Sequence, residues 1–251
     1  MTNTAPAAGE RLPIHACIKT HERAAGIFAG WPREGRALDL AAGSGAFARR
    51  LLDLGFAVDA CDLYPEAFKV PQVHCKYADL SERLPYDDAA FQYLSCLEGV
   101  EHLEDQFAFV RECVRILRPG GRLLLSTPNV LGLASRWRYF WTGFFPLATR
   151  PINEYRRQPV HDHIHLITYH ELRYILRISG FEIEGVTTDR YRRTGLLLGW
   201  AWPVVQLATR RSLRREPESR QREVNREIAA HMLSPALLFG RTLLVLARKA
   251  G

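Results

Sequence analysis

Two acidic residues and a histidine lie close together after an apolar run near the middle of the chain. Glu98, Glu101 and His102 are spaced i, i+3 and i+4, so a helix there would direct all three side chains the same way. The segment 161–165 (HDHIH) offers a further imidazole, that of His163. Two carboxylates with imidazole nitrogens can hold a divalent metal such as Mg²⁺ or Mn²⁺ and leave coordination positions open.

The same residues have two metal-free interpretations. His102 or His163 would act as a general base, with Glu98 as a third candidate catalytic residue. Alternatively, the histidines of 161–165 satisfy backbone groups at the start of the helix expected near Thr168 and do no chemistry.

A glycine-containing turn follows the first predicted strand. RALDL (36–40) runs into AAGSG (41–45) and then a helix, so Gly43 and Gly45 lie where a strand must turn and let a ligand approach its backbone. Asp62 ends the next strand, seventeen residues after Gly45, where its carboxylate can accept hydrogen bonds from both ribose hydroxyls of a nucleoside. GSGAFA also satisfies the dinucleotide-binding pattern, so NAD remains an alternative at this point.

Two further carboxylates favour S-adenosylmethionine (SAM) over NAD. Asp39 lies inside the first strand, where an NAD-binding strand is usually apolar, and it could hold the cationic amino-acid end of SAM. Asp79 ends the third strand, where it could accept a hydrogen bond from an adenine amino group.

Apolar runs alternate with amphipathic stretches, the pattern of βαβ units and a parallel sheet. We expect strands at about 36–41, 57–61, 73–77, 91–96, 121–126, 181–187 and 243–249. We expect helices at about 14–29, 45–54, 64–69, 105–117 and 168–179. The triplet Pro119-Gly120-Gly121 is expected to break the chain between a helix ending at Arg118 and the fifth strand.

LDLAAGSG, AVDACD, YADL, LSCLEGVEHL and RILRPGGRLLLSTPN, in this order, resemble the motifs of class I SAM-dependent methyltransferases of the ubiquinone-biosynthesis type. The resemblance covers about residues 36–188 and the last strand. It implies a Rossmann-like α/β fold: a seven-stranded, mostly parallel sheet with the last strand antiparallel, helices on both faces, and SAM across the carboxyl ends of strands one to four. It also implies these SAM-binding residues: Asp39, Gly43, Gly45, Asp62, Asp79, Leu80 and Leu97. Ala41 stands where the family commonly has its first glycine.

A second resemblance concerns the metal. ExxEH (98–102) followed by DHxxxxTxxEL (162–172) resembles the metal-dependent small-RNA 3′-terminal 2′-O-methyltransferases, and its first half is similar to ubiquinone O-methyltransferases. By this resemblance Glu98, Glu101, His102 and His163 would bind a divalent ion that acts on vicinal oxygens of a ribose or catechol.

Composition sets broader bounds. The 251 residues, 47% of them hydrophobic, predict a single α/β domain over 1–251, and five scattered cysteines without a CxxC pair indicate neither a disulfide framework nor a zinc knuckle. No secretory leader or membrane-spanning stretch is recognised, so a cytoplasmic location is expected. The net charge of +7 favours an anionic partner.

Two insertions, at about 130–160 and 190–233, interrupt the core pattern. The first contains WRYFWTGFF (137–145), and the second contains GWAWPVVQLA (199–208), with nine Arg and two Glu between Arg190 and Arg222. Three interpretations compete: a lid packed over the active site, a face bound to an anionic membrane, or aromatic side chains stacked on nucleic-acid bases. Nucleic acid is the least favoured, because the arginines are interleaved with long aliphatic stretches.

The function expected first is SAM-dependent O-methylation of a sugar, glycan or lipid-linked precursor. The alternatives are a quinone precursor, an RNA ribose, an NAD-dependent oxidoreductase, or a non-catalytic partner subunit with the same fold. Asp39 argues against the oxidoreductase, and the intact Gly43, Gly45 and Asp62 argue against a non-catalytic subunit.

Overall fold

The computed structural model describes residues 12, 17–146, 151–152, 154–155 and 163–251. Its centre is a seven-stranded sheet in the order β3-β2-β1-β4-β5-β7-β6. The strands are β1 (Arg36–Leu40), β2 (Ala57–Asp62), β3 (Cys75–Tyr77), β4 (Phe91–Leu97), β5 (Leu117–Pro128), β6 (Phe181–Thr188) and β7 (Thr242–Lys249). The pairs from β3 to β5 are parallel, and β7 runs antiparallel to both β5 and β6. The predicted sheet with an antiparallel last strand is confirmed.

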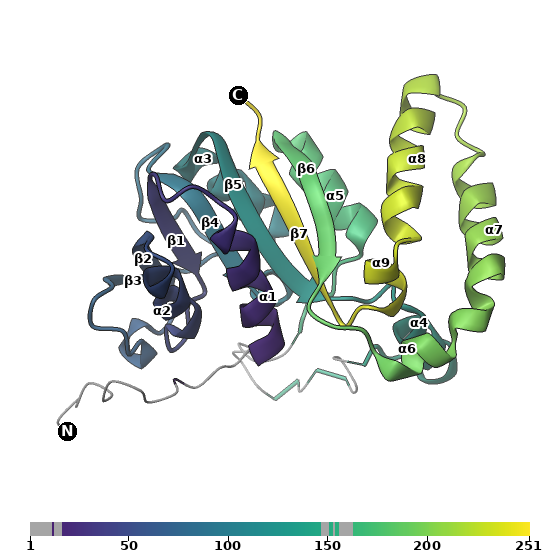
Figure 1. Cartoon of the computed structure of the whole chain (residues 1–251), viewed down its shortest axis with the longest axis horizontal. Coiled ribbons are helices and arrows are strands. Elements are labelled where there is room, and N and C mark those ends of the chain that lie inside the picture. Colours follow the sequence, from purple (N-terminus) through teal and green to yellow (C-terminus); the bar gives the residue numbers. More distant parts are fainter. Residues whose placement is uncertain (1–11, 13–16, 147–150, 153, 156–162) are drawn as a thin grey trace.

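Helices cover both faces of the sheet (Figure 1). One face packs on α1 (Ile18–Ala29) and α2 (Ala46–Asp53), which contribute Phe28 and Phe47 to the core. The other face packs on α3 (Gln106–Ile116) and α5 (Tyr169–Ile178), which contribute Phe109 and Leu172. These two apolar layers hold the carboxyl ends of the parallel strands along one edge of the sheet.

Local sequence explains where the two helices beside the site begin. The Asp105 side chain accepts a hydrogen bond from the Ala108 N–H (2.8 Å) at the start of α3. Thr168 and Glu171 form a capping box that starts α5. Residues 14–16 of the expected N-terminal helix lie outside the described residues, and α1 begins at Ile18.

Two expected elements differ. The helix expected at 64–69 is a single 3-10 turn, Pro65–Ala67 (η1). The triplet 119–121 was expected between a helix and a strand but lies inside β5, which already begins at Leu117. Leu117 pairs with Phe91 and Arg122 with Tyr93, so extra residues bulge out between the two pairs. The glycines absorb this bulge without interrupting the strand, because Gly120 can adopt a φ of 72°.

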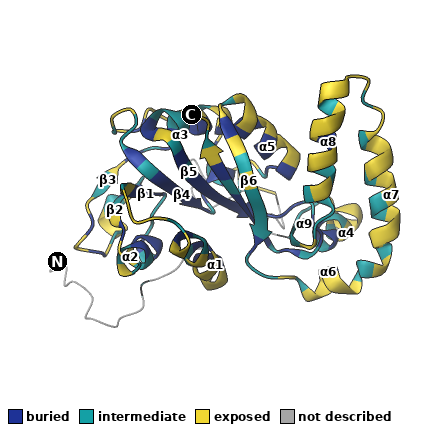
Figure 2. Ribbon diagram, turned by 45° about the horizontal axis from the view of Figure 1, so that its top comes forward, coloured by how far each residue is buried: buried dark blue, intermediate teal, exposed yellow. Residues whose placement is uncertain are grey.

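The insertions form helices at the end of the molecule away from β3. They are α4 (Leu133–Thr142), α6 (Arg193–Leu197), the turn η3 (Gly199–Ala201), α7 (Trp202–Leu213) and α8 (Ser219–Met232), followed by α9 (Pro235–Phe239). α7 and α8 contact each other and form a helical hairpin beside the sheet (Figure 1). Figure 2 shows that the residues of α7 are mainly exposed.

Candidate active site

The glycine turn after β1 is tied to the end of β2 through Asp62. The Gly43 N–H donates a hydrogen bond to one carboxylate oxygen of Asp62 (2.8 Å), and the Tyr64 N–H donates to the other (2.9 Å). Gly43 and Gly45 have φ angles of 53° and 86°. A Cβ on Gly45 would come within 2.7 Å of the Phe68 ring, so this position requires glycine. The structure thus places both glycines and Asp62 at the carboxyl ends of β1 and β2.

Asp39 is a buried carboxyl group two residues before the turn. The Ser95 hydroxyl of β4 donates a hydrogen bond to its Oδ1 atom (2.8 Å). Its Oδ2 atom is buried and accepts no hydrogen bond from the described residues. Burial raises the pKa of Asp39 to about 7. A buried carboxyl oxygen without a partner, next to a glycine turn, fits the cationic amino-acid end of SAM.

The remaining predicted cofactor residues lie at the same edge of the sheet. The Ala78 N–H, just after β3, donates to the backbone oxygen of Asp62 (3.0 Å), which joins the ends of β2 and β3. Asp79 is half-buried, and one of its carboxylate oxygens accepts from the Ser81 N–H (2.8 Å). Leu80 and Leu97 are buried and supply apolar surface. The structure therefore brings the seven residues expected to bind SAM to the carboxyl ends of β1 to β4.

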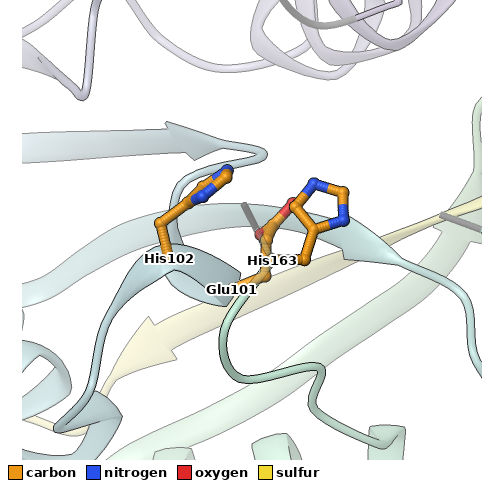
Figure 3. Close-up of side chains that lie close together, drawn as sticks. All are labelled: Glu101, His102 and His163. Carbon is orange, nitrogen blue, oxygen red and sulfur yellow. The ribbon is translucent and has the colours of Figure 1, made fainter. Parts of the chain in front are cut away.

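Three of the four predicted metal ligands converge. One ligand atom from each of Glu101, His102 and His163 lies within 4.8 Å of the others, and the three side chains point toward one another (Figure 3). His163 Nε2 lies 4.0 Å from Glu101 Oε1, and the two imidazole rings have centroids 5.0 Å apart. Glu101 has no exposed surface, and its two carboxylate oxygens have no hydrogen-bond partner among the described residues.

Hydrogen bonds hold together the two segments that carry these side chains. The His165 N–H donates to the backbone oxygen of Glu101 (3.0 Å). The amide nitrogen of Gln106, at the start of α3, donates to the backbone oxygens of both Val100 (2.9 Å) and His165 (3.0 Å). Gln106 was not predicted, because its role depends on two segments that meet only in the folded chain. Its side chain holds the backbone next to the candidate ligands and does not contact their side chains.

Glu98 lies apart from the converging group. The turn after β4 is a short 3-10 helix, Val100–His102 (η2), which begins after Glu98, so the helical spacing expected from the sequence is not formed. Glu98 has a φ of 53°, and its carboxylate accepts a hydrogen bond from the Thr242 hydroxyl at the start of β7 (3.3 Å). Burial raises the pKa of Glu98.

The chemistry of this group is that of a cation site or a proton acceptor. Burial raises the pKa of Glu101 to about 8, because the loss of water around its carboxylate outweighs the lowering effect of nearby hydrogen-bond donors. A divalent ion bound by this carboxylate and two imidazoles would remove that cost. Without an ion, the half-buried imidazoles of His102 and His163 could accept a proton from the hydroxyl group of a methyl acceptor held beside the cofactor.

A parallel sheet closed by an antiparallel strand, with a glycine turn and acidic residues at its carboxyl edge, defines a class I SAM-dependent methyltransferase. A family model described as "Methyltransferase domain" matches residues 10–186, and the chain belongs to this family. The oxidoreductase alternative is therefore wrong, and the chain is an enzyme.

The chain is similar to proteins named "Ubiquinone biosynthesis O-methyltransferase". The match from Xanthomonas axonopodis pv. citri is 30% identical over 173 residues, which cover 64% of this chain and 68% of that protein. The match from Xanthomonas oryzae pv. oryzae is 34% identical over 103 residues, which cover 38% of this chain and 43% of that protein, so the similarity spans less than half of its length.

A solved structure, a SAM-dependent methyltransferase from Archaeoglobus fulgidus, shares the fold. It superposes with a TM-score of 0.57 at 18% identity over 92% of this chain and 93% of its own. Among the helices of the described residues, none has the length and apolar character needed to cross a membrane.

Proposed function

We propose that this enzyme transfers the methyl group of SAM to a hydroxyl oxygen of a quinone precursor that carries two adjacent oxygens, as in a catechol. The observation that carries the proposal is the convergence of Glu101, His102 and His163 after β4, at the sheet edge that holds the cofactor residues. The relatives named for ubiquinone biosynthesis favour this acceptor over the sugar, glycan or lipid-linked precursor that the sequence put first. The reaction is proposed for the cytoplasm, and the five free cysteine thiols support a reducing location.

The chain's own residues bind and orient the reactants. Asp62 and Asp79 would accept hydrogen bonds from the ribose and the adenine of SAM, and Asp39 would face its amino-acid end. Methyl transfer is an in-line displacement, so the acceptor oxygen must lie about 3 to 3.5 Å from the methyl carbon. A bond forms between that oxygen and the methyl carbon while the carbon–sulfur bond breaks, and its electron pair stays on the sulfur of S-adenosylhomocysteine.

The acceptor hydroxyl also loses a proton. His102 and His163 would accept it, and this role is supported by two observations: both imidazoles are only half-buried, and they face the same space. Glu101, His102 and His163 would hold a divalent ion, which would supply Lewis acidity that lowers the pKa of the acceptor hydroxyl. Glu98 remains a candidate fourth ligand or proton acceptor only if its side chain leaves Thr242.

The test compares acceptors and metal content. The purified enzyme is assayed with SAM and a catechol-type quinone precursor, an isolated phenol, a sugar and a short RNA with a free 3′ end, before and after chelation. We expect methylation of the catechol, loss of at least about tenfold in rate after chelation, and recovery with Mg²⁺ or Mn²⁺. Glu101→Gln should cause the same loss, whereas His74→Ala, at an exposed histidine outside the site, should not.

One result would contradict the proposed acceptor, and another would contradict the proposed metal ion. Preferred methylation of the sugar or the RNA would show that the acceptor is wrong. Full catechol methylation by the chelated enzyme, with no metal found by elemental analysis, would show that an imidazole acts as base without an ion.

A further inference from the structure

The insertion helices carry large apolar side chains that remain exposed. We call six of them the apolar face: Trp137, Phe140, Trp141, Leu197, Trp200 and Leu207, whose exposed fractions range from 51 to 77%. Tryptophan is usually well covered in a folded chain, and three of the five tryptophans belong to this set. Exposure on this scale indicates a contact surface.

The residues of the apolar face lie on elements that are neighbours in the fold. On α4, Trp137, Phe140 and Trp141 follow the i, i+3, i+4 spacing of one helix face, and Trp141 packs against the other two rings. α4 contacts α6, α6 contacts η3, and η3 contacts α7. These elements gather at one end of the molecule, beyond β6 (Figures 1 and 2).

Arginines extend the same surface. From residue 190 to residue 215 the chain contains seven arginines and no acidic residue. Four of them, Arg210, Arg211, Arg214 and Arg215, are exposed at the end of α7 and just beyond it. Leu207 and Arg211 are spaced i, i+4, so the apolar side of α7 continues directly into the basic cluster.

We propose that this surface binds peripherally to a membrane that contains anionic phospholipid. The tryptophan, phenylalanine and leucine side chains would enter the boundary between headgroups and acyl chains, and the four arginines would contact lipid phosphates. Two signals act together, because neither the apolar area nor the charge alone gives stable anchoring. The exposure of the apolar face supports this over a lid packed on itself.

Charge argues against a second copy of the chain as the occupant, and the aliphatic side chains argue against nucleic acid. A second copy of the chain would bring its own four arginines against these four, and the acidic residues next to the cluster in the sequence, Glu216 and Glu218, are too few to pair with them all. Nucleic acid would pair with the arginines, but Leu197 and Leu207 cannot stack on bases. A membrane offers anionic phosphates to the four arginines and acyl chains to the apolar face.

The test uses the full chain and vesicles of defined composition. Co-sedimentation is measured with vesicles of phosphatidylcholine alone and with a third phosphatidylglycerol, at low and high salt. We expect binding only to the anionic vesicles, weakened by salt. Arg211→Gln and Arg215→Gln should each lower partitioning by about fivefold, and Trp200→Ser combined with Leu207→Ser should lower it by at least about tenfold.

Matched controls lie elsewhere on the surface. Arg111→Gln changes an exposed arginine of α3, and Ile178→Ser changes a 57% exposed side chain of α5, and both should leave partitioning unchanged. Equal loss in these variants would overturn the assignment of the surface. So would failure of the wild-type chain to sediment with anionic vesicles, a dimer that Trp200→Ser dissociates, or tighter binding to single-stranded RNA than to vesicles.

This inference does not rest on the proposed acceptor, because vesicle binding is measured without turnover. SAM affinity of each variant, measured by calorimetry, reports separately on the fold and the cofactor site. Loss of vesicle binding with unchanged SAM affinity supports the surface, and catechol methylation decides the proposed function independently.

Discussion

At the scale of residues, the two carboxylates nearest the glycine turn have contrasting environments. Asp62 accepts two backbone hydrogen bonds, from Gly43 and Tyr64, and keeps further lone pairs for a ligand. Asp39 is 2% exposed and one of its oxygens has no partner among the described residues. Ala41, between them in the chain, adopts a φ of 55° that would suit glycine better.

The raised pKa of Asp39 predicts a pH dependence of stability. Its pKa is about 7 in the folded chain and near 3.8 when unfolded, so between these values the folded state binds more protons. The free energy of unfolding should therefore fall as pH rises from about 4 to about 7, by a few kcal/mol, and then level off. Urea denaturation of the ligand-free enzyme at several pH values measures this. Asp39→Asn should remove that part of the decline, whereas Asp53→Asn, at an exposed carboxylate, should keep it. Parallel pH profiles for Asp39→Asn and the wild type would contradict the assignment.

The sequence predicted correctly which residues meet where they are brought together by neighbouring elements of the chain. Gly43, Gly45 and Asp62 lie together because a strand, a tight turn and the next strand bring them there whatever the distant chain does. Glu98 was expected to join Glu101 and His102 both from an assumed helical spacing and from the resemblance of ExxEH to a metal-site motif. A 3-10 turn that begins after Glu98 separates it from them, and nothing local in the sequence distinguishes that turn from an α-helix. Gln106 was missed because it bridges segments that are distant in the chain.

At the scale of elements, two side-chain contacts join α8 of the helical hairpin α7–α8 to α5 of the core: the Tyr169 hydroxyl hydrogen-bonds the His231 imidazole, and Arg173 pairs with Glu227. Arg173 of α5, 4% exposed at its side chain, makes two hydrogen bonds to the Glu227 carboxylate of α8, at 2.9 and 2.7 Å. Elsewhere α7 contributes no buried residue. The insertions were recognised from the sequence as departures from the core pattern, but their helices were not placed, because packing against α5 and α9 decides where they lie.

This ion pair predicts how the hairpin is stabilised. Glu227→Ala would leave the Arg173 guanidinium buried without its partner, which should lower the free energy of unfolding by about 1 to 2 kcal/mol. The loss is moderate because the Glu227 side chain is 49% exposed. Hydrogen exchange should accelerate in α8 and not in α3. Glu223→Ala, at an exposed position on the same helix, is the matched control. Unchanged exchange in α8 would show that the hairpin is held by other contacts.

At the scale of the whole molecule, the cofactor cradle and the candidate metal group occupy one edge of the sheet, and the apolar face occupies the end formed by the insertions. The alternation of apolar runs and amphipathic stretches predicted the parallel part of the sheet. The antiparallel last strand was expected only from the resemblance to class I methyltransferases. The position of the apolar face, away from the carboxyl edge of the sheet, was not predictable, because it depends on how α4 packs against α6.

The final prediction distinguishes the SAM site from the candidate metal site by how much each ligand stabilises the folded chain. SAM binds only the folded chain, so at about one hundred times its dissociation constant it should stabilise the enzyme by about 2.7 kcal/mol, and a bound metal should add a second increment. Asp62→Ala should weaken SAM binding by about 1 to 3 kcal/mol and leave the metal increment intact. Glu101→Gln should abolish the metal increment and leave the SAM increment intact, because Asp62 ends β2 whereas Glu101 lies in the turn after β4. Thermal unfolding with each ligand alone and with both measures the SAM and metal increments in the wild type and in the two variants. If Asp62→Ala kept the full SAM increment, the cofactor would bind elsewhere. If Mg²⁺ and Mn²⁺ failed to stabilise the wild-type chain, the buried Glu101 carboxyl would be a proton-binding group, and the chemistry at this edge would belong to the imidazoles of His102 and His163.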